Sequence, residues 1–242
     1  MSERTIKPLG AKAYGSIGHL PNSRMGPADH AITEGQARIA TIKTRDGNDR
    51  VYVQEKLDGS CVAVAKINGE LVPLGRAGYP ALSSQYEMHH YFHRWALTNY
   101  SRFDALLQEG ERAVGEWLIQ AHGTKYNLCH REPFVLFDIM SGTDRIPLET
   151  MYERGWAFAK PELIAESPIT VERAMDTLGT WGYYGATEQI EGAIWRVERN
   201  GKVDFLTKYV RPDKVDGCYL NGNPLWNVTP SWLEEFADDD PN

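Results

Sequence analysis

The chain has 242 residues and a hydrophobic content of 42%, which is enough for one large domain or two small ones with a buried core. Its net charge of −7 argues against indiscriminate nucleic-acid binding, because neutralising phosphates takes many exposed Lys and Arg side chains, but it is compatible with a local basic cleft. No hydrophobic run approaches the roughly 20 residues that span a bilayer, and no signal peptide is recognisable, so we expect no membrane association.

The cysteines bear on the cellular compartment. Cys61, Cys129 and Cys218 are odd in number and widely spaced, unlike a disulfide framework, and they favour a reducing environment. A zinc site built from Cys129, Cys218, His122 and His130 would lack the usual ligand spacing. We therefore expect a cytoplasmic protein with no zinc site, and a compact core suits a phage or bacterial setting.

The expected elements begin after a loop-rich segment. Residues 1–45 are rich in Gly, Pro and polar residues and predict little regular structure. Strands are expected at 51–57 and 61–67, and Asn68-Gly69 predicts a tight turn into a strand at 70–74. Further along, the pattern predicts one or two helices within 86–107, strands at 113–119 and 134–139, helices at 148–159 and 170–178, and a hairpin of strands 190–197 and 203–209. This order predicts an α+β fold, with antiparallel sheets flanked by helices, in a single domain spanning 1–242.

The chemistry-bearing pattern is clearest where the first strand ends. Lys56 and Asp58 lie two residues apart, so on an extended backbone they share a face and point into the same cleft. Gly59 follows and is expected to let the chain turn. A lysine amine beside a carboxylate suits covalent chemistry at a phosphate.

Five more short blocks follow in order, each at or near an expected strand. The full set is Lys56-Leu57-Asp58-Gly59, Gly75-Arg76, Gly115-Glu116-Trp117, Phe137-Asp138-Ile139, Glu191-Gly192-Ala193-Ile194 and Lys208. It resembles motifs I, Ia, III, IIIa, IV and V of the covalent nucleotidyltransferase superfamily, which comprises ATP-dependent DNA ligases, RNA ligases and messenger-RNA capping enzymes. The resemblance covers about residues 50–211 and implies the adenylation domain of that superfamily.

The resemblance implies a covalent step at Lys56. Its amine would attack the α-phosphorus of ATP to give lysyl-AMP and pyrophosphate. A lysine with a pKa of about 10.4 is protonated at neutral pH, so neighbouring cations must favour the neutral form of the amine. The candidates for these cations are Lys208 and a bound metal. Mg²⁺, with Mn²⁺ as the alternative, would be held by Glu191 and Asp58.

The same resemblance assigns the nucleotide-binding side chains. Glu116 would accept a hydrogen bond from a ribose hydroxyl, and Arg76 would hold the ribose and phosphate side. Phe137 would stack on adenine. Glu55, directly before the nucleophile, completes the expected nucleotide-binding set together with Gly59, Glu191 and Arg211.

The sequence departs from the superfamily pattern after Lys208. Motif V is usually KxK, whereas the segment Lys208-Tyr209-Val210-Arg211 lacks the second lysine of that pattern. Arg211 would replace this cation only if the backbone turns its side chain toward the cleft. Arg211-Pro212-Asp213-Lys214 has the RxDK form of motif VI, but we interpret it as a coincidence because it lies too close to Lys208 to sit on a separate domain. The 34 residues after Lys208 are too few for an OB domain, so we expect a minimal catalytic core.

Nucleic acid must then be held by the core itself. The loop at 14–24 offers His19 and Arg24, and the loop at 120–126 offers His122 and Lys125, all suited to phosphate contacts.

Two further groups of residues are expected to be structural. His89, His90 and His93 fall on a helix whose other face is aromatic, and we interpret them as surface or packing residues. Trp226 and Trp232 are expected to anchor the tail to the core.

The combined prediction is an ATP-dependent polynucleotide ligase of the RNA ligase branch. It would act as a monomer and join 5′-phosphate to 3′-hydroxyl ends at nicks in RNA or RNA/DNA duplexes, with RNA on the 3′-hydroxyl side. Glu55 before the nucleophile, the Gly115-Glu116-Trp117 block and the short tail favour this branch. The alternatives are a GTP-dependent capping-type enzyme and a nucleotide-binding module without turnover.

Overall fold

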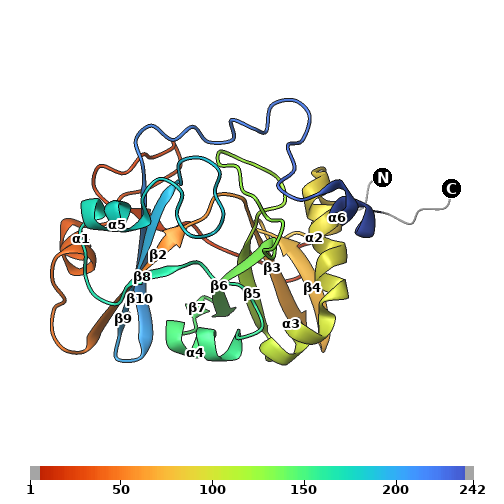
Figure 1. The fold of residues 1–242 in the computed structure, drawn as a ribbon. Coiled ribbons are helices and arrows are strands. Elements are labelled where there is room, and N and C mark those ends of the chain that lie inside the picture. Colours follow the sequence, from red (N-terminus) through yellow and green to blue (C-terminus); the bar gives the residue numbers. More distant parts are fainter. Residues whose placement is uncertain (1–5, 238–242) are drawn as a thin grey trace.

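A computed structural model describes residues 6–237, and within them the strands form two five-stranded sheets (Figure 1). The first sheet has the order β1-β10-β9-β2-β8 and the second the order β4-β3-β5-β6-β7. The strand bounds are β1 (Gly18–His19), β2 (Asp49–Lys56), β3 (Ser60–Ile67), β4 (Glu70–Gly75), β5 (Glu111–Trp117), β6 (Phe134–Ser141), β7 (Asp144–Arg145), β8 (Leu163–Ala165), β9 (Gly192–Arg199) and β10 (Lys202–Val210). Apart from the parallel β1–β10 pair, neighbouring strands are antiparallel, which confirms the expected α+β fold.

The helices cover the outer faces of the two sheets (Figure 1). Their bounds are α1 (Glu34–Thr41), α2 (Glu87–Thr98), α3 (Tyr100–Leu106), α4 (Leu148–Arg154), α5 (Val171–Leu178) and α6 (Pro230–Glu235), with a short 3₁₀ helix η1 (Ala81–Ser83). Helices α1 and α5 pack beside the first sheet, whereas α2 and α3 pack on the second.

Two of the expected elements can be compared in detail. Little regular structure was expected at 1–45, and within residues 6–45 the helices and strands are α1 and the short strand β1. Thr33 and Gln36 cap the start of α1 reciprocally, a pattern that the sequence already displays. The helix expected at 148–159 ends at Arg154, where Gly155 caps it.

Strand β2 shows how the alternation of side chains positions the site. Val51 and Val53 pack with Ala37 of α1 in the core outside the first sheet, whereas Tyr52 belongs to the core of the second sheet. Since side chains alternate across a strand, Lys56 lies on the same face as Tyr52 and is directed between the two sheets.

The Lys56–Gly59 block is the crossover from one sheet to the other. Lys56 ends β2 in the first sheet, and Ser60 begins β3 in the second. Between them, a Cβ on Gly59 would lie 2.5 Å from the backbone oxygen of Trp117. The chain bends at Gly59, as expected, and glycine is also needed here for the close approach to β5.

The C-terminal segment packs on the second sheet and its helices. The rings of Trp226 and Trp232 lie 5.5 and 6.3 Å from that of Tyr91, and Trp232 also contacts Trp117. The prediction that these tryptophans anchor the tail is confirmed. No helix within residues 6–237 is long and apolar enough to cross a membrane.

Candidate active site

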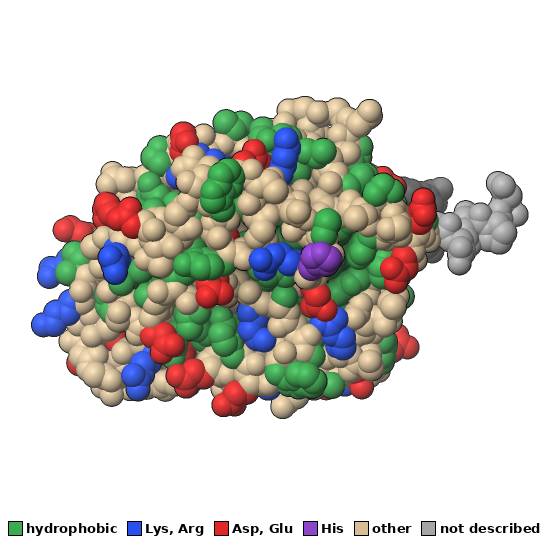
Figure 2. Space-filling view, viewed as in Figure 1, with side chains coloured by type: hydrophobic (Ala, Val, Ile, Leu, Met, Phe, Trp, Pro, Cys, Tyr) green, Lys and Arg blue, Asp and Glu red, His purple; other side chains and the backbone are tan. Residues whose placement is uncertain are grey.

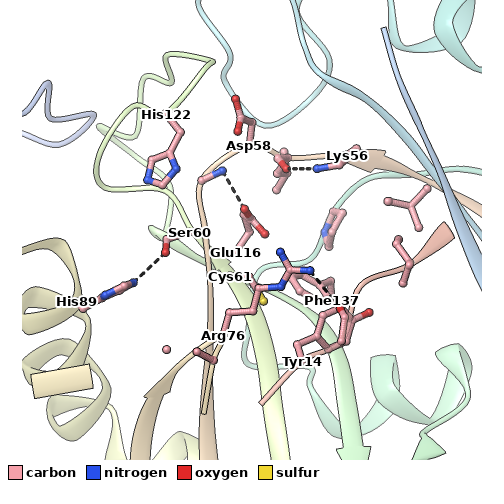
Figure 3. A pocket seen from close by; sticks show the side chains of 18 of the residues that line it. Tyr14, Lys56, Asp58, Ser60, Cys61, Arg76, His89, Glu116, His122 and Phe137 are labelled. Atoms are coloured by element: carbon pink, nitrogen blue, oxygen red, sulfur yellow. Dashed lines mark hydrogen bonds between the residues drawn. The ribbon is translucent and has the colours of Figure 1, made fainter. Parts of the chain in front are cut away.

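A pocket of about 900 Å³ lies between the two sheets, and most of the predicted site residues line it (Figure 3). The predicted residues on its wall are Glu55, Lys56, Asp58, Gly59, Arg76, Glu116, His122, Phe137 and Lys208. They come from both sheets and from the loop after β5, so the fold gathers blocks that are far apart in the chain.

Lys56 is paired with Glu191. Strand register sets Lys56 opposite Gly192, and the Nζ of Lys56 lies 2.6 Å from the Oε2 of Glu191. Burial alone would lower the pKa of Lys56, but the charges of Glu191, Glu116 and Asp58 outweigh burial and raise this pKa above its ordinary value. Carboxylates, rather than the expected cations, therefore dominate the surroundings of the amine, and they hold it protonated.

Asp58 is paired with a lysine that the sequence analysis had set aside. The Oδ2 of Asp58 lies 2.6 Å from the Nζ of Lys214 and accepts a hydrogen bond of 2.9 Å from the backbone N–H of Gly123. Lys214 is only 2% exposed and also donates to the hydroxyl of Thr124. Lys214 was not among the residues predicted for the site, and the segment after β10 brings it there by folding back onto the Lys56–Gly59 block.

Glu116 lies beside the crossover, where its Oε1 accepts a 2.9 Å hydrogen bond from the backbone N–H of Gly59. Burial, opposed by the charge of Lys56, raises the pKa of Glu116 to about 7. Arg76 lies across from it and extends toward the N-terminal segment, with 3.4 Å from its Nη2 to the backbone oxygen of Gly15 (Figure 3).

Phe137 and Tyr14 form an aromatic corner of the pocket (Figure 3). Their ring centroids are 5.3 Å apart in an edge-to-face arrangement. Behind them the buried carboxylate of Asp138 accepts hydrogen bonds from Tyr14, Arg145 and Arg196 at 2.7 to 3.0 Å. The sequence analysis missed Tyr14, whose partners are more than a hundred positions away in the chain.

Lys208 reaches the pocket from β10, where the charges of Asp29 and Lys56 act on its pKa in opposite directions. Its Nζ lies 3.6 Å from Asp29, which also lies 3.2 Å from His19. Burial and the nearby charge of Lys56 lower the pKa of Lys208. The two lysine amines are thus close enough to repel each other, and a phosphate contact of Lys208 stays a prediction.

Several predicted residues are engaged elsewhere. Arg211 donates to the backbone oxygen of Ile190 and pairs with Asp213, and it does not line the pocket, so it does not replace the missing cation of motif V. The carboxylate of Glu55 accepts a 2.9 Å hydrogen bond from the backbone of Tyr183. Its contact with a nucleotide stays a prediction.

The four residues proposed for nucleic acid have different surroundings, and their contacts with nucleic acid stay predictions. His122 lines the pocket, but His19 is buried against Asp29, Arg24 pairs with Asp216, and Lys125 lies over the ring of Tyr219. Over the face in view in Figure 2, Lys and Arg side chains are interspersed with Asp and Glu.

Comparison with known proteins establishes the family. Residues 49–210, more than half of the chain, match the RNA ligase family, and the chain belongs to that family. No curated protein matches the chain. The match begins at β2 and ends at β10, so it includes all six motif blocks.

Solved structures with a similar fold are RNA ligases. A mutant Naegleria gruberi RNA ligase with ATP and Mn has a TM-score of 0.52 at 13% identity, over 86% of this chain and 61% of that one. The same ligase with PPi has a TM-score of 0.52 at 15% identity, over 80% of this chain and 59% of that one. An archaeal ATP-dependent RNA ligase reaches 0.47 at 20% identity, over 67% of this chain and 43% of that one. This chain therefore spans about half of the length of these proteins, and at such identities the likeness shows the fold.

Proposed function

We propose that this chain is an ATP-dependent RNA ligase core that adenylates itself on Lys56 and joins 5′-phosphate to 3′-hydroxyl ends. Its substrate would be a nick in a duplex with RNA on the 3′-hydroxyl side. The observation that carries this proposal is the convergence of Lys56, Asp58, Glu116 and Lys208 on one pocket, with the Lys56 amine paired at 2.6 Å with Glu191.

The first step would place ATP in the pocket with its α-phosphorus at Lys56. The Lys56 ammonium first gives up a proton, and the Oε2 of Glu191 is placed to accept it because it already contacts Nζ. The neutral amine then attacks, an N–P bond forms, the bond to pyrophosphate breaks, and the second amine proton passes to solvent. Lys208 and Arg76 line the same pocket and would stabilise charge on the phosphates.

A divalent metal fits this site as a companion of the nucleotide. Within residues 6–237, no cluster of three or more His, Cys, Asp or Glu side chains could hold a metal ion. Mg²⁺ commonly binds through one or two carboxylates and substrate phosphates, and Glu191 and Asp58 are the carboxylates that would hold it. When bound, the metal would offset negative charge on the triphosphate.

The second and third steps follow from the family. The adenylyl group would pass from Lys56 to the 5′-phosphate of the polynucleotide, and the adjacent 3′-hydroxyl would displace AMP to seal the strand. We propose that the protein does this as a monomer in a cytoplasmic compartment, in keeping with its three free cysteines. A phage or bacterial source stays a prediction.

A sealing assay tests the proposal. The purified chain is incubated with a 5′-labelled nicked duplex and either ATP or GTP with Mg²⁺, and the product length is read on a denaturing gel. We expect sealing with ATP and none with GTP. Sealing or covalent labelling with GTP alone would indicate a capping-type enzyme, and nucleotide affinity without adduct or sealing would indicate a binding module.

A further inference from the structure

The pocket continues past the nucleophile to the side of α2. Figure 3 shows His89 and His122 on this side, across Asp58 and Glu116 from Lys56. His89 comes from α2 and His122 from the loop after β5. The sequence analysis interpreted His89 as a surface or packing residue, but it lines the pocket, as do its neighbours Ser60, Ser84 and Tyr86.

Ser60, His89 and Ser84 form a hydrogen-bonded chain. The Nε2 of His89 lies 2.9 Å from the hydroxyl of Ser60, and its Nδ1 lies 2.7 Å from the hydroxyl of Ser84. Burial lowers the pKa of His89 to about 4, and burial also lowers the pKa of His122, so both imidazoles are neutral at pH 7. A neutral imidazole has one donor and one acceptor nitrogen, so it donates to one serine and accepts from the other.

This chain suits a hydroxyl group rather than a phosphate. If His89 donates to Ser60, the Ser60 hydroxyl hydrogen is available to a ligand. If His89 accepts from Ser60, a lone pair of the Ser60 oxygen is available instead. A sugar hydroxyl both donates and accepts, so it fits either arrangement. At Ser60, Ser84 and His89 a phosphate would find no cation to pair with, because these three side chains are neutral.

Next to this chain is an exposed aromatic ring. Tyr86 is 55% exposed and lies at the rim, with its ring centroid 6.0 Å from that of His89 in an edge-to-face arrangement. Exposed tyrosines beside a nucleic-acid site provide faces on which unpaired or terminal bases stack. The region thus combines hydroxyl-binding groups with a base-stacking group.

We propose that Ser60, His89, His122 and Tyr86 form the subsite for the 3′-terminal ribonucleoside of the strand to be joined, and this rests on the proposed ligase function. Ser60 and His89 bind the 2′-hydroxyl of that nucleoside, and Tyr86 packs on its base. The 2′-hydroxyl distinguishes RNA from DNA, so the subsite confers the requirement for a ribonucleotide end.

The test compares two nicked duplexes that differ only in the 2′-hydroxyl of the 3′-terminal nucleotide. Single-turnover sealing rates are measured for the wild type, Ser60→Ala, His89→Ala and His93→Ala, and the readout is the ratio of the ribo rate to the deoxy rate for each protein. Because both rates use the same adenylated enzyme, the ratio is unaffected by losses in folding or in adenylation. His93 is the matched control, since it lies on α2 but does not line the pocket.

We expect the wild type to seal the ribo end about tenfold faster than the deoxy end, or more, because losing a hydrogen bond in a buried site usually costs at least this factor. Ser60→Ala and His89→Ala should lower the ribo rate and bring the ratio toward one, whereas His93→Ala should keep the ratio of the wild type. A wild type that seals both ends equally, or variants that slow both equally, would overturn the subsite. If His89→Ala fails to fold, Ser60→Ala alone decides. Absence of Lys56 adenylation in the wild type would instead refute the proposed function.

Discussion

Lys214 and Asp58 form a buried ion pair, with 2.6 Å between Nζ and Oδ2, that ties the segment after β10 to the nucleophile motif. Asp58 has a second partner in the backbone N–H of Gly123, so its carboxylate is held in one orientation. The charge of Lys214 also lowers the pKa of Glu191, against the larger, raising effect of burial. Lys214 thus supplies a positive charge beside Asp58, in a chain whose motif V has one cation fewer than the superfamily pattern.

Removing this charge should destabilise the site. Lys214→Met keeps the length of the side chain but leaves Asp58 without its cation, and we expect the free energy of unfolding to fall by about 3 kcal/mol, as for other broken buried pairs. Adenylation should also slow, because the orientation of Asp58 is lost. Denaturant unfolding and single-turnover adenylation measure the two effects.

Lys66 provides the matched control for Lys214. It pairs with Asp104 at the same distance of 2.6 Å, but that aspartate is 46% exposed. We expect Lys66→Met to cost about 0.5 kcal/mol or less, as for a surface pair. Equal costs for the two variants would contradict the role assigned to Lys214.

The amine of Lys56 should be unreactive without nucleotide, because Glu191 raises its pKa. Glu191→Gln removes that charge while burial remains, so the pKa of Lys56 should fall. An acylating reagent applied at pH 8, with labelling of Lys56 followed by mass spectrometry, should show about tenfold more labelling for a fall of about one unit in the pKa. Glu188→Gln is the control, since Glu188 binds Tyr219 instead. Unchanged or slower labelling in Glu191→Gln would count against the pair.

Glu116 should make stability depend on pH. Its pKa rises from 4.5 to about 7 on folding, so the folded state favours the neutral carboxyl, and this stabilisation is complete below pH 4.5 and lost as the pH rises through 7. Relative to the wild type, Glu116→Gln should therefore raise the free energy of unfolding by about 2 kcal/mol more at pH 8 than at pH 4.5. At pH 8 this corresponds to an increase in Tm of several degrees.

Thermal unfolding of Glu116→Gln at the two pH values checks this expectation. Glu109→Gln is the control, because Glu109 is exposed and binds the backbone of the Asn68-Gly69 turn. A Tm difference from the wild type that does not change with pH would show that Glu116 is not the group responsible.

The sequence was sufficient to predict most of the fold and the centre of the site. Lys56, Asp58, Glu116 and Glu191 lie at or beside strands with clear alternation, so short patterns placed them correctly. Lys214, Tyr14 and His89 were missed because their partners are distant in the chain, and no local pattern indicates that a loop lysine will be buried against Asp58. The pairing of Lys56 with carboxylates also depends on strand register, which the sequence alone did not provide.

The central claim is that Lys56 forms a covalent bond to adenylate, and the intact mass of the protein tests it most directly. After incubation with ATP and Mg²⁺ we expect a mass increase of one adenylyl group on the wild type, stable to denaturation, located on Lys56 by peptide mapping and absent from Lys56→Arg. An unmodified wild type that nevertheless binds ATP, or an adduct that persists in Lys56→Arg, would contradict the account.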